Sequence, residues 1–73
     1  MTQQELLSLG YRYLFTVEET QLEIWAQCID ETENNRLFSY YYFSPKLGET
    51  VGSLNCFSEK TIELLKEILH NFN

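Results

Sequence analysis

The segment from Gln21 to Ser44 constrains this chain most, because it places large apolar side chains on both sides of a predicted β-hairpin. Successive side chains of a strand point to opposite faces of the sheet. Trp25 and Ile29 therefore share one face of the first strand. The opposite face of that strand receives Leu22, Ile24, Ala26 and Cys28. One helix covers only one face of a small sheet, so the sequence predicts a second cover for the other face.

The second strand of the hairpin, residues 37–43, carries an aromatic residue on each face in either register. A turn of even length gathers Trp25, Ile29, Phe38, Tyr40 and Tyr42 on one face. A turn of odd length instead gathers Trp25, Ile29, Leu37, Tyr41 and Phe43. Because interfaces are enriched in Trp and Tyr, we predict that this aromatic face, with the first set as its members, binds a second subunit or another protein. Two alternatives stay open: the N-terminal helix covers the face, or the face forms a small-ligand pocket.

A short helix is predicted at the start of the chain, over about residues 3–9. Thr2 and Glu5 have the spacing of a capping box, in which each side chain bonds the backbone of the other residue. Gly10 is placed to end the helix. A strand follows over residues 11–17, with aromatic and β-branched residues at its odd positions. The alternation predicts that one face of this strand carries Tyr11, Tyr13, Phe15 and Val17.

The C-terminal region predicts a short fourth strand over about residues 50–57, followed by an amphipathic helix with Ser58 as its N-cap. The apolar side of this helix carries Ile62, Leu65, Ile68, Leu69 and Phe72, with Leu64 at its margin. The order of elements predicts a single α+β domain over residues 1–73. We expect a small antiparallel sheet of three to four strands, a β-meander, with a short N-terminal helix and the C-terminal amphipathic helix packed on one face.

The charge of the chain weighs against nucleic acid as a direct partner. Eleven acidic and five basic residues give a net charge of −6. Nucleic-acid affinity comes largely from phosphates neutralised by Lys and Arg, so direct binding is not expected. The order of elements is similar to that of double-stranded-RNA-binding domains, which carry a basic cluster at the start of their last helix. Here that position reads Ser58-Glu59-Lys60-Thr61, so the RNA-binding function is not carried over.

Three carboxylates, those of Glu59, Glu63 and Glu67, follow one another at helical spacing on the polar side of the last helix. The structural interpretation is a solvated helix face, on which like charges repel weakly. The functional alternative is an acidic strip that mimics phosphates and occupies a nucleic-acid-binding protein. Small acidic inhibitors encoded by phages and plasmids have this size and charge. This inhibitor is our second functional hypothesis, and a small-ligand binder is the third.

Motifs for catalysis or cofactors are not found in the sequence. His70 is the single histidine and has no nucleophile close to it in the chain. Cys28 and Cys56 lack the spacing of a zinc site and are predicted to be small buried thiols. The three glycines are isolated, so no phosphate-binding loop is expected. The sequence therefore predicts a protein that is not an enzyme and that needs no cofactor or metal.

The length of the chain favours association. Domains of this size bury a small core and often gain stability from a second subunit. The polar start of the chain, residues 2–5, is not typical of a secretory signal. No apolar run approaches the roughly 20 residues of a membrane span. We therefore predict a cytoplasmic protein, not bound to membranes, that binds protein and forms a homodimer.

Overall fold

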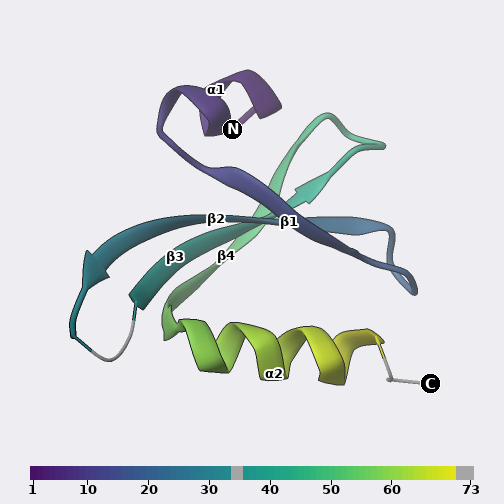
Figure 1. The fold of residues 1–73 in the computed structure, drawn as a ribbon. Helices are drawn as coiled ribbons and strands as arrows, with labels where there is room; N and C mark the ends of the chain where they lie inside the picture. The colour runs from purple at the N-terminus through teal and green to yellow at the C-terminus, as the bar shows by residue number, and fades with distance from the viewer. Residues whose placement is uncertain (34–35, 71–73) are drawn as a thin grey trace.

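The computed structural model describes residues 1–33 and 36–70, with side chains described for all of these except residues 54–57, 59 and 68–70. It has one antiparallel sheet with a helix on each side (Figure 1). The elements in chain order are α1 (Gln3–Ser8), β1 (Arg12–Val17), β2 (Leu22–Glu31), β3 (Arg36–Ser44), β4 (Glu49–Ser58) and α2 (Glu59–His70). The strands lie in the order β1-β2-β3-β4, so each pairs with the next along the chain. The predicted α+β meander is confirmed.

The capping box forms as predicted at the start of α1. Thr2 Oγ1 accepts a hydrogen bond from the Glu5 amide at 3.3 Å, and the Glu5 carboxylate accepts one from the Thr2 amide at 3.0 Å. These bonds to Thr2 lower the pKa of the Glu5 carboxyl below its ordinary value, because they favour the ionised form. The helix ends just before Gly10, whose φ of +96° is a conformation that suits glycine.

A bulge in the β2–β3 hairpin decides which side chains share a face. Glu31 pairs with Arg36, so the turn has the even length on which the first aromatic set depended. Ile29 has no partner on β3, because Asp30 pairs with Leu37 and Cys28 with Phe38. The pairing is therefore shifted by one residue between Ile29 and the start of β2, where Trp25 pairs with Tyr41. An extra residue in one strand exchanges the two faces of everything beyond it. The predicted set is therefore corrected: the face opposite Trp25 carries Phe38, Tyr40 and Tyr42.

A second bulge divides β1. Tyr13 pairs with Trp25 and Phe15 pairs with Ile24, which leaves Leu14 as the additional residue. The prediction that the odd positions of this strand share one face is wrong for this reason. Tyr11 lies in the cluster around Trp25, whereas Phe15 lies in the core on the other face. The strand thus contributes aromatic side chains to both sides of the sheet.

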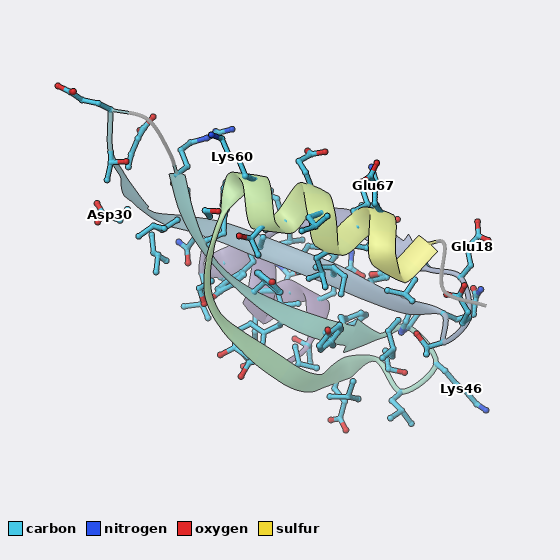
Figure 2. All side chains as sticks on the ribbon, turned by 90° about the horizontal axis from the view of Figure 1, so that it is seen from below. Glu18, Asp30, Lys46, Lys60 and Glu67 are labelled. Carbon is cyan, nitrogen blue, oxygen red and sulfur yellow. The ribbon has the colours of Figure 1, made fainter. Side chains whose placement is uncertain are left out.

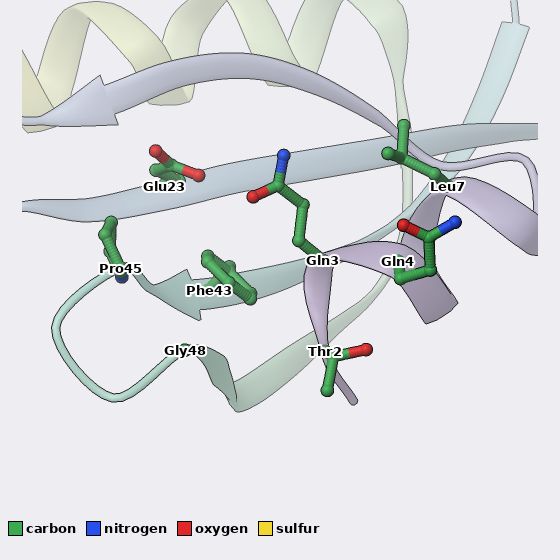
Figure 3. Close-up of a pocket in the computed structure, with 8 residues that line it drawn as sticks. All are labelled: Thr2, Gln3, Gln4, Leu7, Glu23, Phe43, Pro45 and Gly48. Atoms are coloured by element: carbon green, nitrogen blue, oxygen red, sulfur yellow. The ribbon is translucent and has the colours of Figure 1, made fainter.

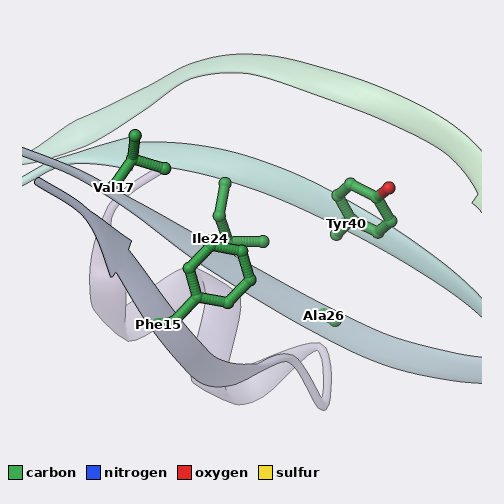
Figure 4. Close-up of a cluster of buried hydrophobic side chains, with 5 residues drawn as sticks. All are labelled: Phe15, Val17, Ile24, Ala26 and Tyr40. Carbon is green, nitrogen blue, oxygen red and sulfur yellow. The ribbon is translucent and has the colours of Figure 1, made fainter. Parts of the chain in front are cut away.

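The sheet face under α2, called here the α2 face, holds a core centred on strands β1 to β3 (Figure 4). Its buried members are Phe15, Val17, Ile24, Ala26 and Tyr40. Ile62 and Leu65 of α2 pack against them, as the amphipathic pattern predicted. Ser58 Oγ accepts a hydrogen bond from the Thr61 amide at 3.2 Å and so caps the helix. The predicted apolar side chains of Ile68, Leu69 and Phe72 lie outside the described ones.

The opposite face, called here the α1 face, holds a smaller and more aromatic cluster. Its buried members are Leu6, Tyr11, Trp25 and Phe43. The rings of Tyr11 and Tyr41 meet edge to face with centroids 5.2 Å apart, and those of Trp25 and Phe43 lie 6.2 Å apart. The start of the chain is tied to β4, because the Met1 carbonyl accepts a hydrogen bond from the Thr50 amide at 2.7 Å. These contacts hold α1 over the sheet.

Candidate protein-binding surfaces

Trp25, the centre of the predicted interface, lies beneath α1 with only 4% of its surface exposed. The ring of Tyr13 meets it edge to face at a centroid distance of 6.1 Å. Its indole Nε1 donates a hydrogen bond of 2.9 Å to the Glu23 carboxylate. The N-terminal helix is therefore the cover that the second face required. In this arrangement Trp25 is not accessible to a partner.

The other members of the predicted set lie in different surroundings. Ile29 is 49% exposed at its bulge. Phe38 and Tyr42 are half-buried beside the α2-face core, and Tyr40 is fully buried within it. Burial raises the pKa of Tyr40 to about 12, with a smaller contribution from Tyr42, whose own pKa is also raised by burial. The five residues thus do not form one open surface.

The acidic residues of α2 lie where the sequence placed them. Glu63 and Glu67 are exposed, and Figure 2 shows Glu67 and Lys60 pointing away from the sheet. Lys66 is exposed on the same helix, and its Nζ lies 5.8 Å from the ring centroid of Phe15. The side chain of Glu59 lies outside the described ones. The exposed carboxylates of Glu63 and Glu67 therefore share α2 with the exposed ammonium groups of Lys60 and Lys66.

A group of exposed apolar side chains follows the path of the chain from α1 into β1. We call this group the α1–β1 edge; it consists of Leu7, Leu9, Tyr13 and Leu14. Leu9 is 55% exposed and Tyr13 is 49% exposed. The sequence pattern did not indicate this group, because strict alternation places Tyr13 on one face with Phe15. The available signal was the density of leucines before Gly10, which exceeds what one side of a two-turn helix can bury.

A hollow of about 560 Å³ lies between the start of α1 and the turn from β3 to β4 (Figure 3). Its lining residues are Thr2, Gln3, Gln4, Leu7, Glu23, Phe43, Pro45 and Gly48. Glu23 comes from β2, and its carboxylate is the one ionisable side chain in this lining. A second hollow, of about 490 Å³, is lined by Thr20, Gln21, Ser44, Pro45 and Lys46.

The side chains suited to covalent or metal chemistry are few. Cys28 is exposed, so the prediction of a buried thiol is wrong for this residue. It lies at the beginning of the stretch 28–33, which is exposed throughout, and its Sγ donates to the Asp30 carbonyl at 3.4 Å. The side chains of Cys56 and His70 lie outside the described ones. Among the side chains that are described, no group of three or more His, Cys, Asp or Glu is arranged to hold a metal ion.

Comparisons with protein-family models, with curated proteins and with solved structures found no match to this chain. Within residues 1–33 and 36–70, no helix combines the length and the apolar character that crossing a membrane requires.

Proposed function

We propose that this protein is a non-enzymatic binding module that forms a homodimer through the α1–β1 edge. The observation that carries the proposal is the exposure of four large apolar side chains from α1 to β1, an outer strand of the sheet: Leu7, Leu9, Tyr13 and Leu14. Soluble proteins rarely leave such groups open unless they bind something. Removing them from water stabilises a complex by about 25 cal/mol per Å² of apolar surface.

The charges around β1 favour a second copy of this chain as the partner. A two-fold axis perpendicular to β1 places the start of one strand next to the end of the other. Arg12 of each copy then approaches the turn of the other copy that carries Glu18 and Glu19. The strand itself contains no acidic residue, so two chains of net charge −6 meet there with little repulsion. The bulge at Leu14 limits regular strand pairing, so apolar side chains rather than a long ladder provide the contact.

Analytical ultracentrifugation across micromolar concentrations tests the dimer. The wild type should sediment with twice the 8.7 kDa mass of the chain. Leu14→Asp should give a monomer with an unchanged circular dichroism spectrum, because Leu14 is exposed in the single chain. Leu64→Asp is the matched control, since Leu64 is an exposed leucine of α2 that is not a member of the α1–β1 edge. A wild-type monomer at every concentration would contradict the proposal.

A charge swap tests the orientation of the two copies. Arg12→Glu should weaken the dimer, because it removes the attraction to the opposite turn and adds repulsion. Combining it with Glu18→Lys and Glu19→Lys should restore association. If the triple variant associates no better than Arg12→Glu alone, the two-fold arrangement is wrong.

The acidic inhibitor is the second candidate function, supported by the outward exposure of Glu63 and Glu67. A phosphate-mimicking strip acts through charge, so capture of its partner from a host lysate should weaken steeply as salt is raised. Reversing both residues to Lys should remove that capture without affecting the dimer. Capture that is insensitive to salt and to these changes would refute this function.

A further inference from the structure

A half-buried carboxylate lies in the wall of the hollow between α1 and the β3–β4 turn. Glu23 projects from β2, and one of its oxygens accepts the indole N–H of Trp25 at 2.9 Å. Among the described residues this carboxylate has no cationic partner, and none of the five basic residues of the chain lines the hollow. A carboxylate attracts a cation, and the hydrogen bonds that it accepts from a charged donor are stronger than those from a neutral one.

The rest of the lining offers what an organic cation needs. Gln3 and Gln4 contribute amide oxygens, which accept hydrogen bonds from a cation, and Figure 3 shows both side chains on the α1 wall. Phe43 also lines the hollow, and with 4% of its surface exposed it contributes a small apolar part of the wall. The positive α-amino group of Met1 is hydrogen-bonded to Thr50 Oγ1 at 2.8 Å, so it is engaged elsewhere.

We propose that this hollow binds the cationic end of a basic side chain from a partner protein, with the guanidinium of arginine preferred. A guanidinium carries five N–H donors in a planar fork, so it can bond the Glu23 carboxylate and also donate to a second acceptor such as the Gln3 amide, which Figure 3 shows on the side of Glu23. An ammonium group is a compact charge that cannot span several acceptors in this way. The hollow shares Leu7 with the α1–β1 edge, but the polar groups proposed to bind the cation, those of Glu23, Gln3 and Gln4, are not members of that edge.

The indole N–H of Trp25 reports directly on this site, since it is bonded to the Glu23 carboxylate and the chain has a single Trp. The experiment titrates ¹⁵N-labelled protein with N-acetyl-arginine amide at constant ionic strength and follows the indole N–H resonance. We expect a saturable shift with the arginine compound and a weaker response to N-acetyl-lysine amide. The neutral isostere, N-acetyl-citrulline amide, should give none. Equal affinity for the arginine and lysine compounds would overturn the preference for a guanidinium.

Variants test whether the shift of the indole N–H resonance arises from binding in the hollow. Glu23→Gln keeps an oxygen for the indole N–H but removes the charge, so affinity should fall at least about tenfold. Glu33→Gln, which changes an exposed acid just after the end of β2, is the matched control and should bind as wild type does. Gln3→Ala should weaken binding less, and it replaces Glu23→Gln as the decisive variant if that protein does not fold. The monomeric Leu14→Asp variant should titrate normally, which separates this site from the dimer.

Three results would overturn the proposal. The first is the absence of a saturable shift up to about 50 mM, well above the millimolar affinity expected of a single charged contact. The second is an equal response to the citrulline compound, which would show that charge is not recognised. The third is unchanged affinity in Glu23→Gln.

Discussion

The two faces of the sheet are covered by helices of very different length, yet each has a fully buried centre. The helix α2 has 12 residues and α1 has 6. Tyr40 on the α2 face and Leu6 on the α1 face are both 0% exposed. The difference lies in the side chains beneath: the α2 face includes Ala26, whereas the α1 face centres on large rings such as that of Trp25. Because aromatic rings bury a large area, Leu6 and Met1 are enough to close the α1-face cluster itself.

Because α1 is short, it leaves part of the sheet uncovered at its edge. A helix of this length is not stable alone, and α1 depends on its capping box and on the bonds from Met1 to Thr50. It is also too small to cover the beginning of β1, where Leu9 and Tyr13 stay exposed. The surface proposed for self-association therefore lies on the side of the sheet that has the smaller helix.

The largest effect on stability should come from truncating one leucine in each of the two helices that cover the sheet. Leu6→Ala removes a fully buried side chain, so the free energy of unfolding should fall by about 2–5 kcal/mol. Leu65→Ala removes a half-buried one from α2 and should cost less, about 1–3 kcal/mol. Urea denaturation of both variants gives the comparison. A larger loss for Leu65→Ala would mean that the α2 face, and not the α1 face, depends more on its leucine.

Alkaline pH should affect the α2 face through Tyr40. Its folded-state pKa of about 12 lies above the value near 10 of an unfolded chain, so the folded state holds this proton more tightly. The contribution is fully present below pH 10 and is lost as pH rises from 10 to 12, by at most about 3 kcal/mol. Urea denaturation across this range should show a shallower decline for Tyr40→Phe. Identical slopes would show that Tyr40 does not cause the loss.

The smallest effect should come from the two helix caps. Thr2→Ala and Ser58→Ala each remove a side-chain acceptor from an N-terminal amide, at a cost of about 1 kcal/mol. Only the first variant loosens the helix above Trp25, so only Thr2→Ala should shift the tryptophan fluorescence toward longer wavelength. A similar shift in Ser58→Ala would indicate that the two faces are not independent.

Local patterns in the sequence correctly predicted the features that depend on a few neighbouring residues. Thr2 and Glu5 specify the capping box with their own side chains, and the spacing of Ile62 and Leu65 fixes the face that α2 buries. The exposed positions of Glu63 and Glu67 follow from the same helical period. Such features are decided within one or two turns of chain, so no distant contact is needed to predict them.

The grouping of aromatic side chains was decided only by the tertiary structure. The sequence determined that both sides of the sheet are apolar and that each needs a cover. It did not determine which rings share a side, because the bulges at Ile29 and Leu14 each exchange the faces of a strand. A bulge is stabilised by the packing on both faces at once, and no pattern within a single strand records that packing. For this reason Trp25 could be assigned to a face in advance, whereas its neighbours and its burial beneath Leu6 could not.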